Sequence, residues 1–289
     1  MKSKSRFLQL LAVTLTLIVT STGARAQALF WAVDNFRTAN QINGDTGAVV
    51  DSFSLPSGAS LAVVGNTGYY TKLNDANVYT VDMTTHVLGA IAFNTGLSSN
   101  MNSLTVDSDQ HLWFGHGGSG ASNVLQEFTT SGTLLSTHAF PTASSSYRDG
   151  LVVYGGFAVA NRGDQVGPYD KYLLPSAAND PLSYVLPAPG TPFINANLGG
   201  NNGIAFNGVN FYVSNEQIHV VTKWDINGNF VSQANLPSNS RYENWTFASQ
   251  AIIPPPVTGA VPEPSTYGLM GVAALGLFVA IRRRRSNAA

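Results

Sequence analysis

The 289-residue sequence contains no cysteine, and only 11% of its residues are charged. The absence of cysteine excludes disulfide scaffolds, thiolate zinc sites and cysteine nucleophiles. The formal net charge is only −1, but residues 27–260 hold fifteen acidic and seven basic residues, a net charge of about −8. A segment this acidic, with no basic stripe, is unsuited to binding nucleic acid, because displacing counterions from phosphate requires lysines and arginines.

The N-terminus has the three-part pattern of a secretory signal peptide. A basic start at residues 2–6 precedes an apolar run at residues 7–19. Ala24 and Ala26 then match the small-x-small site that signal peptidase cleaves, which predicts a mature start at Gln27. The alternative is an N-terminal membrane anchor, but an apolar run of about 13 residues is shorter than the roughly 20 that span a bilayer.

The C-terminus carries a second three-part pattern. Its first part is the motif Val261, Pro262, Glu263, Pro264 and Ser265. An apolar stretch, residues 267–281, follows this motif and predicts a hydrophobic helix. The helix is followed by a basic stop that consists of Arg282, Arg283, Arg284 and Arg285. The arginines would hold the end of the helix on the cytoplasmic side of a membrane. An ordinary C-terminal anchor is the alternative interpretation.

This order of motif, apolar helix and arginines resembles the PEP-CTERM sorting signal of Gram-negative bacteria. The resemblance implies recognition by exosortase, a membrane protease-transpeptidase associated with exopolysaccharide-producing bacteria, with Pro262, Glu263 and Pro264 as the recognition motif. It also implies that the C-terminal helix anchors the protein transiently in the inner membrane. The tail would then be removed, and the protein would reach the cell surface or the extracellular matrix.

Between the two signals, a pattern of four short strands repeats along the chain. Runs rich in valine, leucine and aromatic residues alternate with turn sequences such as Asn207-Gly208. The first strands of successive units begin, at spacings of 43, 47 and 53 residues, near Leu61, Leu104, Leu151 and Ile204. Four strands in roughly 40–50 residues are typical of a β-propeller blade.

The ends of this repeat region complement each other. Residues 28–34 match a second strand that lacks a first strand, and residues 243–253 match an extra first strand. The C-terminal strand can therefore complete the N-terminal blade and close the ring. We predict an all-β propeller of five four-stranded blades, with a six-bladed ring or an open five-blade arc as alternatives. The expected segments are a signal peptide with its helix at 1–26, the propeller at 27–253, a proline-rich linker at 254–260 and the sorting signal at 261–289.

The sequence of the last blade resembles that of blades in NHL, YVTN and gluconolactonase-type propellers. Residues 203–208, G-I-A-F-N-G, precede residues 211–215, F-Y-V-S-N. In those families, a blade often has the sequence G-I-A-F-D-G followed by L-Y-V-T-N. The resemblance is to a widespread fold and carries no function by itself.

Short polar residues recur at two equivalent positions of the blades. Just before first strands lie Asn102, Asp149, Asn202 and Asn244. Just after second strands lie Asp34, His116, Asn161 and Asn215. In a propeller these positions converge on one face around the channel, where their oxygens could hold Ca²⁺ or hydrogen-bond a sugar. The alternative, which we favour, is that these side chains cap turns by accepting hydrogen bonds from backbone N–H groups.

Other motifs limit the kinds of binding or catalytic site that the sequence supports. Aromatic residues recur in the second strands, where we expect them to pack between blades rather than to bind carbohydrate: Trp31, Tyr70, Trp113 and Tyr212. His111 and His116 are five residues apart on a strand and a turn, which is not the spacing of a helical zinc pair. The sequence has no G-x-S-x-G elbow, so a serine hydrolase is unsupported.

Together these observations predict a non-enzymatic, exosortase-sorted binding or structural propeller, with exopolysaccharide or another surface ligand as its partner. Signal peptidase and exosortase would be its partners during export. The alternative is a Ca²⁺-dependent hydrolase or lyase of the gluconolactonase-like type, with Asp149, Asn202, Asn244 and Asp34 around the ion. The pore glutamate expected in gluconolactonases is not evident. No cofactor is expected apart from Ca²⁺ under this alternative.

Overall fold

The computed structural model describes residues 28–34, 37–72, 75–96, 101–116, 123–141, 150–161, 168–185, 192–196, 201–215, 217–237, 242–246 and 248–249. All regular secondary structure in this part of the chain is β-strand. The predicted signal peptide, the proline-rich linker and the sorting signal lie outside it. No helix among the described residues is long and apolar enough to cross a membrane. The chain divides into two compact units, residues 1–250 and 251–289, and every described residue belongs to the first.

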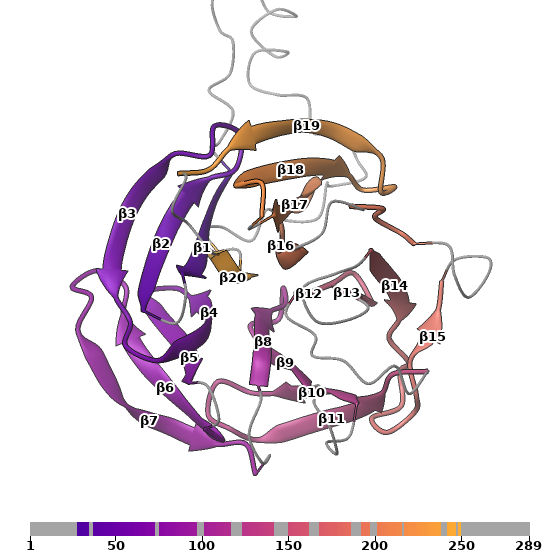
Figure 1. Ribbon diagram of the computed structural model, residues 1–289. Coiled ribbons are helices and arrows are strands. Elements are labelled where there is room, and N and C mark those ends of the chain that lie inside the picture. Colours follow the sequence, from indigo (N-terminus) through magenta and orange to yellow (C-terminus); the bar gives the residue numbers. More distant parts are fainter. Residues whose placement is uncertain are drawn as a thin grey trace, which may run out of the picture. The chain divides into compact units, whose positions relative to one another are not determined.

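Five sheets form the blades of a propeller, and the strands of each blade run in order from the centre outward (Figure 1). Blade 1 contains β20 (Tyr242–Thr246), β1 (Leu29–Asp34), β2 (Thr38–Asn43) and β3 (Val49–Ser54). Blade 2 contains β4 (Gly58–Val64), β5 (Thr67–Lys72), β6 (Asn77–Asp82) and β7 (Leu88–Asn94). Blade 3 contains β8 (Met101–Val106), β9 (Leu112–His116), β10 (Val124–Phe128) and β11 (Leu134–Ala139).

The last two blades follow the same order. Blade 4 contains β12 (Leu151–Tyr154), β13 (Phe157–Asn161), β14 (Tyr169–Leu173) and β15 (Ser183–Tyr184). Blade 5 contains β16 (Asn201–Phe206), β17 (Asn210–Asn215), β18 (Val220–Asp225) and β19 (Phe230–Asn235). The predicted all-β, five-bladed propeller of four-stranded blades is therefore confirmed.

The ring closes through the C-terminal strand, as predicted. Strand β20 pairs antiparallel with β1, and Trp31 lies opposite Thr246. In Figure 1 the indigo strands of blade 1 accordingly lie beside the orange strands of blade 5. The innermost strands also contact one another in the cyclic order β20, β4, β8, β12, β16 and back to β20. The six-bladed ring and the open arc are therefore wrong.

The single strand predicted at residues 243–253 is divided in the structure, where a second short strand follows the closing strand. Strand β21 (Ala248–Ser249) pairs parallel with the end of β4, where Ala248 lies opposite Val63. Strand β20 thus pairs with blade 1, and the next strand, β21, pairs with blade 2. The predicted propeller limits at residues 27 and 253 stay predictions, because both residues lie outside the described part of the chain.

The hydrophobic core is divided among the five interfaces between neighbouring blades. Phe30 packs with Tyr212 of blade 5, whereas its neighbour Trp31 packs with Tyr70 of blade 2. Successive side chains of a strand point to opposite faces, so each blade contributes to two interfaces. Trp113 belongs to the cluster between blades 3 and 4. The interfaces between blades 2 and 3 and between blades 4 and 5 have their own clusters. The predicted inter-blade packing of the four second-strand aromatics is confirmed.

Asparagine and aspartate side chains shape several turns of the hairpins. Asp82 Oδ1 accepts hydrogen bonds from the backbone N–H groups of Thr84 and Thr85, both over 2.8 Å. The same arrangement, with the side-chain oxygen accepting from two backbone N–H groups a few residues ahead, is made by Asn43, Asp107, Asn207, Asn215 and Asp225. Repeated Asx residues therefore reflect, at these positions, repeated turn geometry.

Turns between third and fourth strands also join neighbouring blades. Gly47 has a φ of +74°, and a Cβ placed on it would lie 2.0 Å from the carbonyl oxygen of Asn235 in blade 5. Only glycine fits both the positive φ and this close approach. At the equivalent turn of blade 2, His86 has a φ of 58°, and its ring stacks on Phe53 of blade 1 with centroids 4.6 Å apart.

Candidate functional site

The positions predicted to form a ligand site fall at one edge of the blades, where first strands begin and second strands end. We call this edge the rim. The rim positions at strand ends or one residue inside them are Asp34, Asn102, His116, Asn161, Asn202 and Asn215. Asn244 is the middle residue of β20, and Asp149 lies outside the described residues. The structure describes the side chains of only three of the eight residues: Asp34, Asn161 and Asn215.

Asn161 and Asn215 both support the backbone of the rim. Asn215 is only 1% exposed, and its Oδ1 accepts hydrogen bonds from Gln217 N over 3.0 Å and Ile218 N over 3.1 Å. Asn161 is fully buried, and its Oδ1 accepts a hydrogen bond from Gly150 N over 3.3 Å. The amide oxygen of Asn215 thus caps a turn, and that of Asn161 holds the backbone of the neighbouring strand. Asp34 is half-buried, and its backbone carbonyl accepts a hydrogen bond from Arg37 N. As a ligand set, the eight residues stay a prediction.

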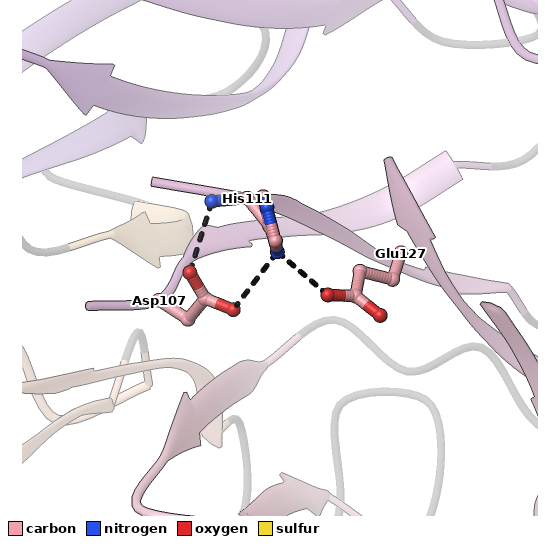
Figure 2. Close-up of side chains that lie close together, drawn as sticks. All are labelled: Asp107, His111 and Glu127. Carbon is pink, nitrogen blue, oxygen red and sulfur yellow. Dashed lines mark hydrogen bonds and ion pairs between the residues drawn. The ribbon is translucent and has the colours of Figure 1, made fainter. Parts of the chain in front are cut away.

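The sequence did not single out a second group of polar side chains, which lies at the opposite edge of blade 3. Asp107 and His111 flank the turn between β8 and β9, and Glu127 lies near the end of β10 (Figure 2). Strand pairing places Glu127 opposite Trp113, two residues after His111. We call Asp107, His111 and Glu127 the blade 3 cluster.

The three side chains of this cluster converge on the imidazole ring. His111 Nδ1 lies 2.7 Å from Glu127 Oε1 and 3.9 Å from Asp107 Oδ2. Figure 2 shows both carboxylates directed at this nitrogen. The side chains of Asp107, Glu127 and His111 are 13%, 17% and 31% exposed, so the cluster is partly desolvated yet open to solvent.

Neighbouring groups hold both carboxylates in place. Asp107 Oδ1 accepts hydrogen bonds from the backbone N–H groups of Asp109 and His111, both over 2.9 Å. Asp107 Oδ2 accepts one from Trp113 Nε1 over 2.7 Å. Ser136 Oγ donates to Glu127 Oε2 over 2.8 Å. Both carboxylates are therefore fixed by the turn and by adjacent strands before any ligand arrives.

The chemistry of this arrangement is that of a ligand set rather than of an activated nucleophile. The Ser136 hydroxyl bonds to the carboxylate and not to the imidazole, which differs from the order in a serine–histidine–acid triad. One imidazole nitrogen and two carboxylate oxygens within 4.8 Å of one another are instead donors that transition metals use. Among the described residues, no other three histidine, aspartate or glutamate side chains come this close.

The sequence does not show this cluster, because the histidine nearest to His111 in the sequence is not its partner in the structure. His111 and His116 lie at opposite ends of β9. The partners that matter are Asp107, four residues earlier, and Glu127, sixteen residues later. A sequence feature that could identify the cluster is an aspartate and a histidine on either side of the turn between the first and second strands of a blade, together with a glutamate on the third strand.

Comparison with known proteins assigns the C-terminal segment. Residues 260–285 match the PEP-CTERM protein-sorting motif. The chain carries a PEP-CTERM sorting signal. This finding confirms the predicted motif, and it implies an exported protein that is anchored transiently in the membrane and processed by exosortase. The match covers only this tail and leaves the activity of the propeller open.

Similarity elsewhere is confined to solved structures, since no curated protein matches the chain. A structure of a nidogen/laminin complex is 11% identical with a TM-score of 0.48, and the match covers 77% of this chain and 98% of that chain. A Bacteroides caccae protein of unknown function is 12% identical with a TM-score of 0.46, covering 76% and 98%. Virginiamycin B lyase from Staphylococcus aureus is 15% identical with a TM-score of 0.42, covering 71% and 66%. None of these likenesses transfers an activity.

Proposed function

We propose that the protein acts at the cell surface or in the extracellular matrix as a non-enzymatic binding or structural propeller. The observation that carries this proposal is a sorting motif at residues 260–285 in a chain whose preceding residues form a five-bladed ring. Propellers closed by a terminal strand are rigid platforms without free inner edges, which suits a protein that works outside the cell.

The described polar groups favour binding over catalysis. On the rim, Asn161 and Asn215 use their amide oxygens to hold backbone N–H groups. In the blade 3 cluster, the Ser136 hydroxyl donates to the Glu127 carboxylate and not to the His111 imidazole, so these described residues do not form a serine–histidine–acid relay. A binding role requires only the surface of the ring and its loops.

The charge of the propeller segment indicates the class of ligand. Its net charge of about −8 repels anionic polymers at low ionic strength. Neutral polymers are unaffected by this charge, and cationic polymers are attracted to it. We therefore expect a neutral exopolysaccharide, or a surface ligand with basic groups, to be bound in preference to an acidic one.

Replacing the sorting motif tests the export part of this proposal. In a producing bacterium that has exosortase, the variant with Pro262, Glu263 and Pro264 changed to alanine should accumulate in the membrane fraction, whereas the native chain should be found outside. A matched variant with Pro254, Pro255 and Pro256 changed to alanine should sort normally. An unchanged distribution of the motif variant would contradict exosortase sorting.

Titration with Ca²⁺ separates a binding propeller from the Ca²⁺-dependent hydrolase or lyase. A ligand that binds only the folded protein must raise its melting temperature. We expect no shift of the melting temperature in millimolar Ca²⁺, together with co-sedimentation of the protein with neutral exopolysaccharide. A clear Ca²⁺-dependent shift, with no polysaccharide binding, would instead support the enzymatic alternative.

A further inference from the structure

We propose that Asp107, His111 and Glu127 form a binding site for a first-row divalent transition metal ion of the Zn²⁺ type. The inference is independent of the function proposed above, because the cluster lies at the edge of blade 3 opposite the rim. It also differs from the Ca²⁺ site of the alternative interpretation of the sequence in its residues, its position and its metal.

The backbone presents the three ligand atoms from rigid elements. Asp107 and His111 are joined by three turn residues, Ser108–Gln110, and Asp107 itself caps this turn. Glu127 lies on β10, which pairs with β9 along its length. The three donor atoms therefore come together without any loop having to close, which limits the conformational entropy lost on binding.

The spacing of the donor atoms is close to that of a coordinated ion. Bonds of about 2.0–2.1 Å in tetrahedral geometry separate two ligand atoms by about 3.3 Å. The Nδ1 of His111 lies 2.7 Å from the Glu127 oxygen and 3.9 Å from the Asp107 oxygen. The first separation is about 0.6 Å shorter and the second about 0.6 Å longer than this value, so side-chain adjustments of this order accompany the entry of an ion.

Second contacts orient the ligands in the manner typical of metal centres. Ser136 holds the outer oxygen of Glu127, so that the inner oxygen stays directed at His111. Trp113 and two backbone N–H groups hold the carboxylate of Asp107. Groups of this kind, which touch the ligand and not the ion, contribute to metal affinity because they fix the ligand orientation.

Electrostatics also favours a divalent ion. Two ionised carboxylates whose oxygens lie within 4.8 Å of one imidazole nitrogen carry two negative charges in a partly desolvated site. A hydrogen-bonded imidazole compensates at most one of these charges, whereas a divalent cation compensates both. The partial exposure of His111, 31%, leaves an open direction for water as a fourth ligand.

The donor types select the class of metal. Ca²⁺ takes six to eight oxygen ligands and Mg²⁺ prefers to keep most of its water, so neither ion gains from an imidazole nitrogen. One nitrogen with two carboxylate oxygens suits Zn²⁺, Co²⁺ and their neighbours in the first row. Zn²⁺ and Co²⁺ are therefore the appropriate probes.

Calorimetric titration of Zn²⁺ into the full chain, purified in detergent without a histidine tag, tests the site. We expect one ion per chain, and at least a tenfold loss of affinity in His111→Gln and in Glu127→Gln. Ser136→Ala should lose about tenfold, because it removes only a group that orients a ligand. His86→Gln is the matched control, since His86 is also part-exposed but faces a single carboxylate, Asp51, at 3.4 Å. This control should bind Zn²⁺ as the native chain does.

The visible absorption of Co²⁺ gives a readout of coordination that does not depend on stability. The native chain should show a ligand-field spectrum that His111→Gln loses and His86→Gln keeps. If His111→Gln does not fold, the Co²⁺ spectra of Glu127→Gln and Ser136→Ala are compared with that of the native chain to test the site. The proposal is overturned if the native chain binds no Zn²⁺ in the micromolar range. It is equally overturned if the folded cluster variants bind Zn²⁺ as tightly as the native chain.

Discussion

The Lys223 ammonium donates a hydrogen bond to Asp45 Oδ1 over 2.6 Å, although 178 residues separate the two in sequence. Lys223 lies on β18 of blade 5, and Asp45 lies in the turn between β2 and β3 of blade 1. The Tyr212 hydroxyl donates to the same oxygen over 3.3 Å. The first and last blades are thus joined by this polar contact as well as by the pairing of β20 with β1.

Removing this contact should weaken the ring slightly and in a pH-dependent way. Burial lowers the pKa of Lys223, but its hydrogen bond to Asp45 and its contact with Tyr212 outweigh this effect and raise the pKa above 10.5. The stabilisation is therefore complete below the pKa of an unfolded lysine and disappears as the pH rises through the higher folded value. Because Asp45 is nearly half exposed, we expect Asp45→Asn to lose only about 0.5 kcal/mol.

Chemical denaturation at neutral pH and at a pH above the folded pKa of Lys223 checks this prediction. The native chain and Asp45→Asn should differ at neutral pH and coincide at the higher pH. Asp109→Asn, which removes an exposed acid elsewhere on the hairpin edge, should match the native chain throughout. A difference between the native chain and Asp45→Asn that persists above the folded pKa of Lys223 would refute the role assigned to Lys223.

The turn of blade 1 should tolerate no side chain at Gly47. Gly47→Ala introduces a Cβ at a positive φ and drives it against the carbonyl oxygen of Asn235. Gly65→Ala is the matched control, since Gly65 has a φ of +57° but open space around its Cβ position. A positive φ alone costs about 1 kcal/mol, so we expect a loss of that size for Gly65→Ala and at least about 2–3 kcal/mol for Gly47→Ala. Equal losses, measured by urea unfolding, would show that the contact between blades 1 and 5 is unimportant.

Asn229 should control the titration of the Asp225 carboxylate. The pKa of Asp225 is lowered from 3.8 by hydrogen bonds from the Asn229 side chain and backbone, and by further backbone N–H groups of the turn. A carboxylate with a depressed folded pKa stabilises the protein above the unfolded pKa and loses this contribution as the pH falls through the folded value. We expect Asn229→Ala to move the pKa of Asp225 toward 3.8, as measured by NMR titration of its carboxyl carbon. If the pKa of Asp225 stays equally depressed in this variant, the hydrogen bond from the Asn229 side chain does not lower it.

Asn215 should contribute to stability and not to ligand binding. Asn215→Ala removes the acceptor for two backbone N–H groups of the turn after β17, so we expect a loss of about 1–2 kcal/mol in the free energy of unfolding. Binding of neutral exopolysaccharide by the folded variant should be unchanged. Lost binding at unchanged stability would restore Asn215 to the ligand set predicted from the sequence.

The repeat was sufficient to predict the architecture, because each blade depends on local signals. Leu61, Leu104, Leu151 and Ile204 mark the first strands, and the unmatched strand at residues 28–34 required a partner that residues 242–246 supply. The outer strand of blade 4 was less predictable. It consists of the two-residue β15, and a separate single bridge joins Ile194 to Tyr169.

The sites were harder to predict because function and turn formation use the same residue types. Asn161 and Asn215 match a ring of oxygen ligands in composition, yet both accept hydrogen bonds from the backbone. The blade 3 cluster depends on strand register, which places Glu127 beside the turn that holds Asp107 and His111. A sequence pattern does not contain this information until the hairpin pairing is known.

Exosortase sorting of a folded propeller to the outside of the cell is the central proposal. It can be tested by the intact mass of the protein recovered from the cell surface or the medium of the producing bacterium. We expect a chain that begins at Gln27 and ends at or close to the motif at residues 261–265, without Arg282–Arg285. Recovery of an extracellular chain that still contains the apolar stretch and its four arginines would contradict this proposal.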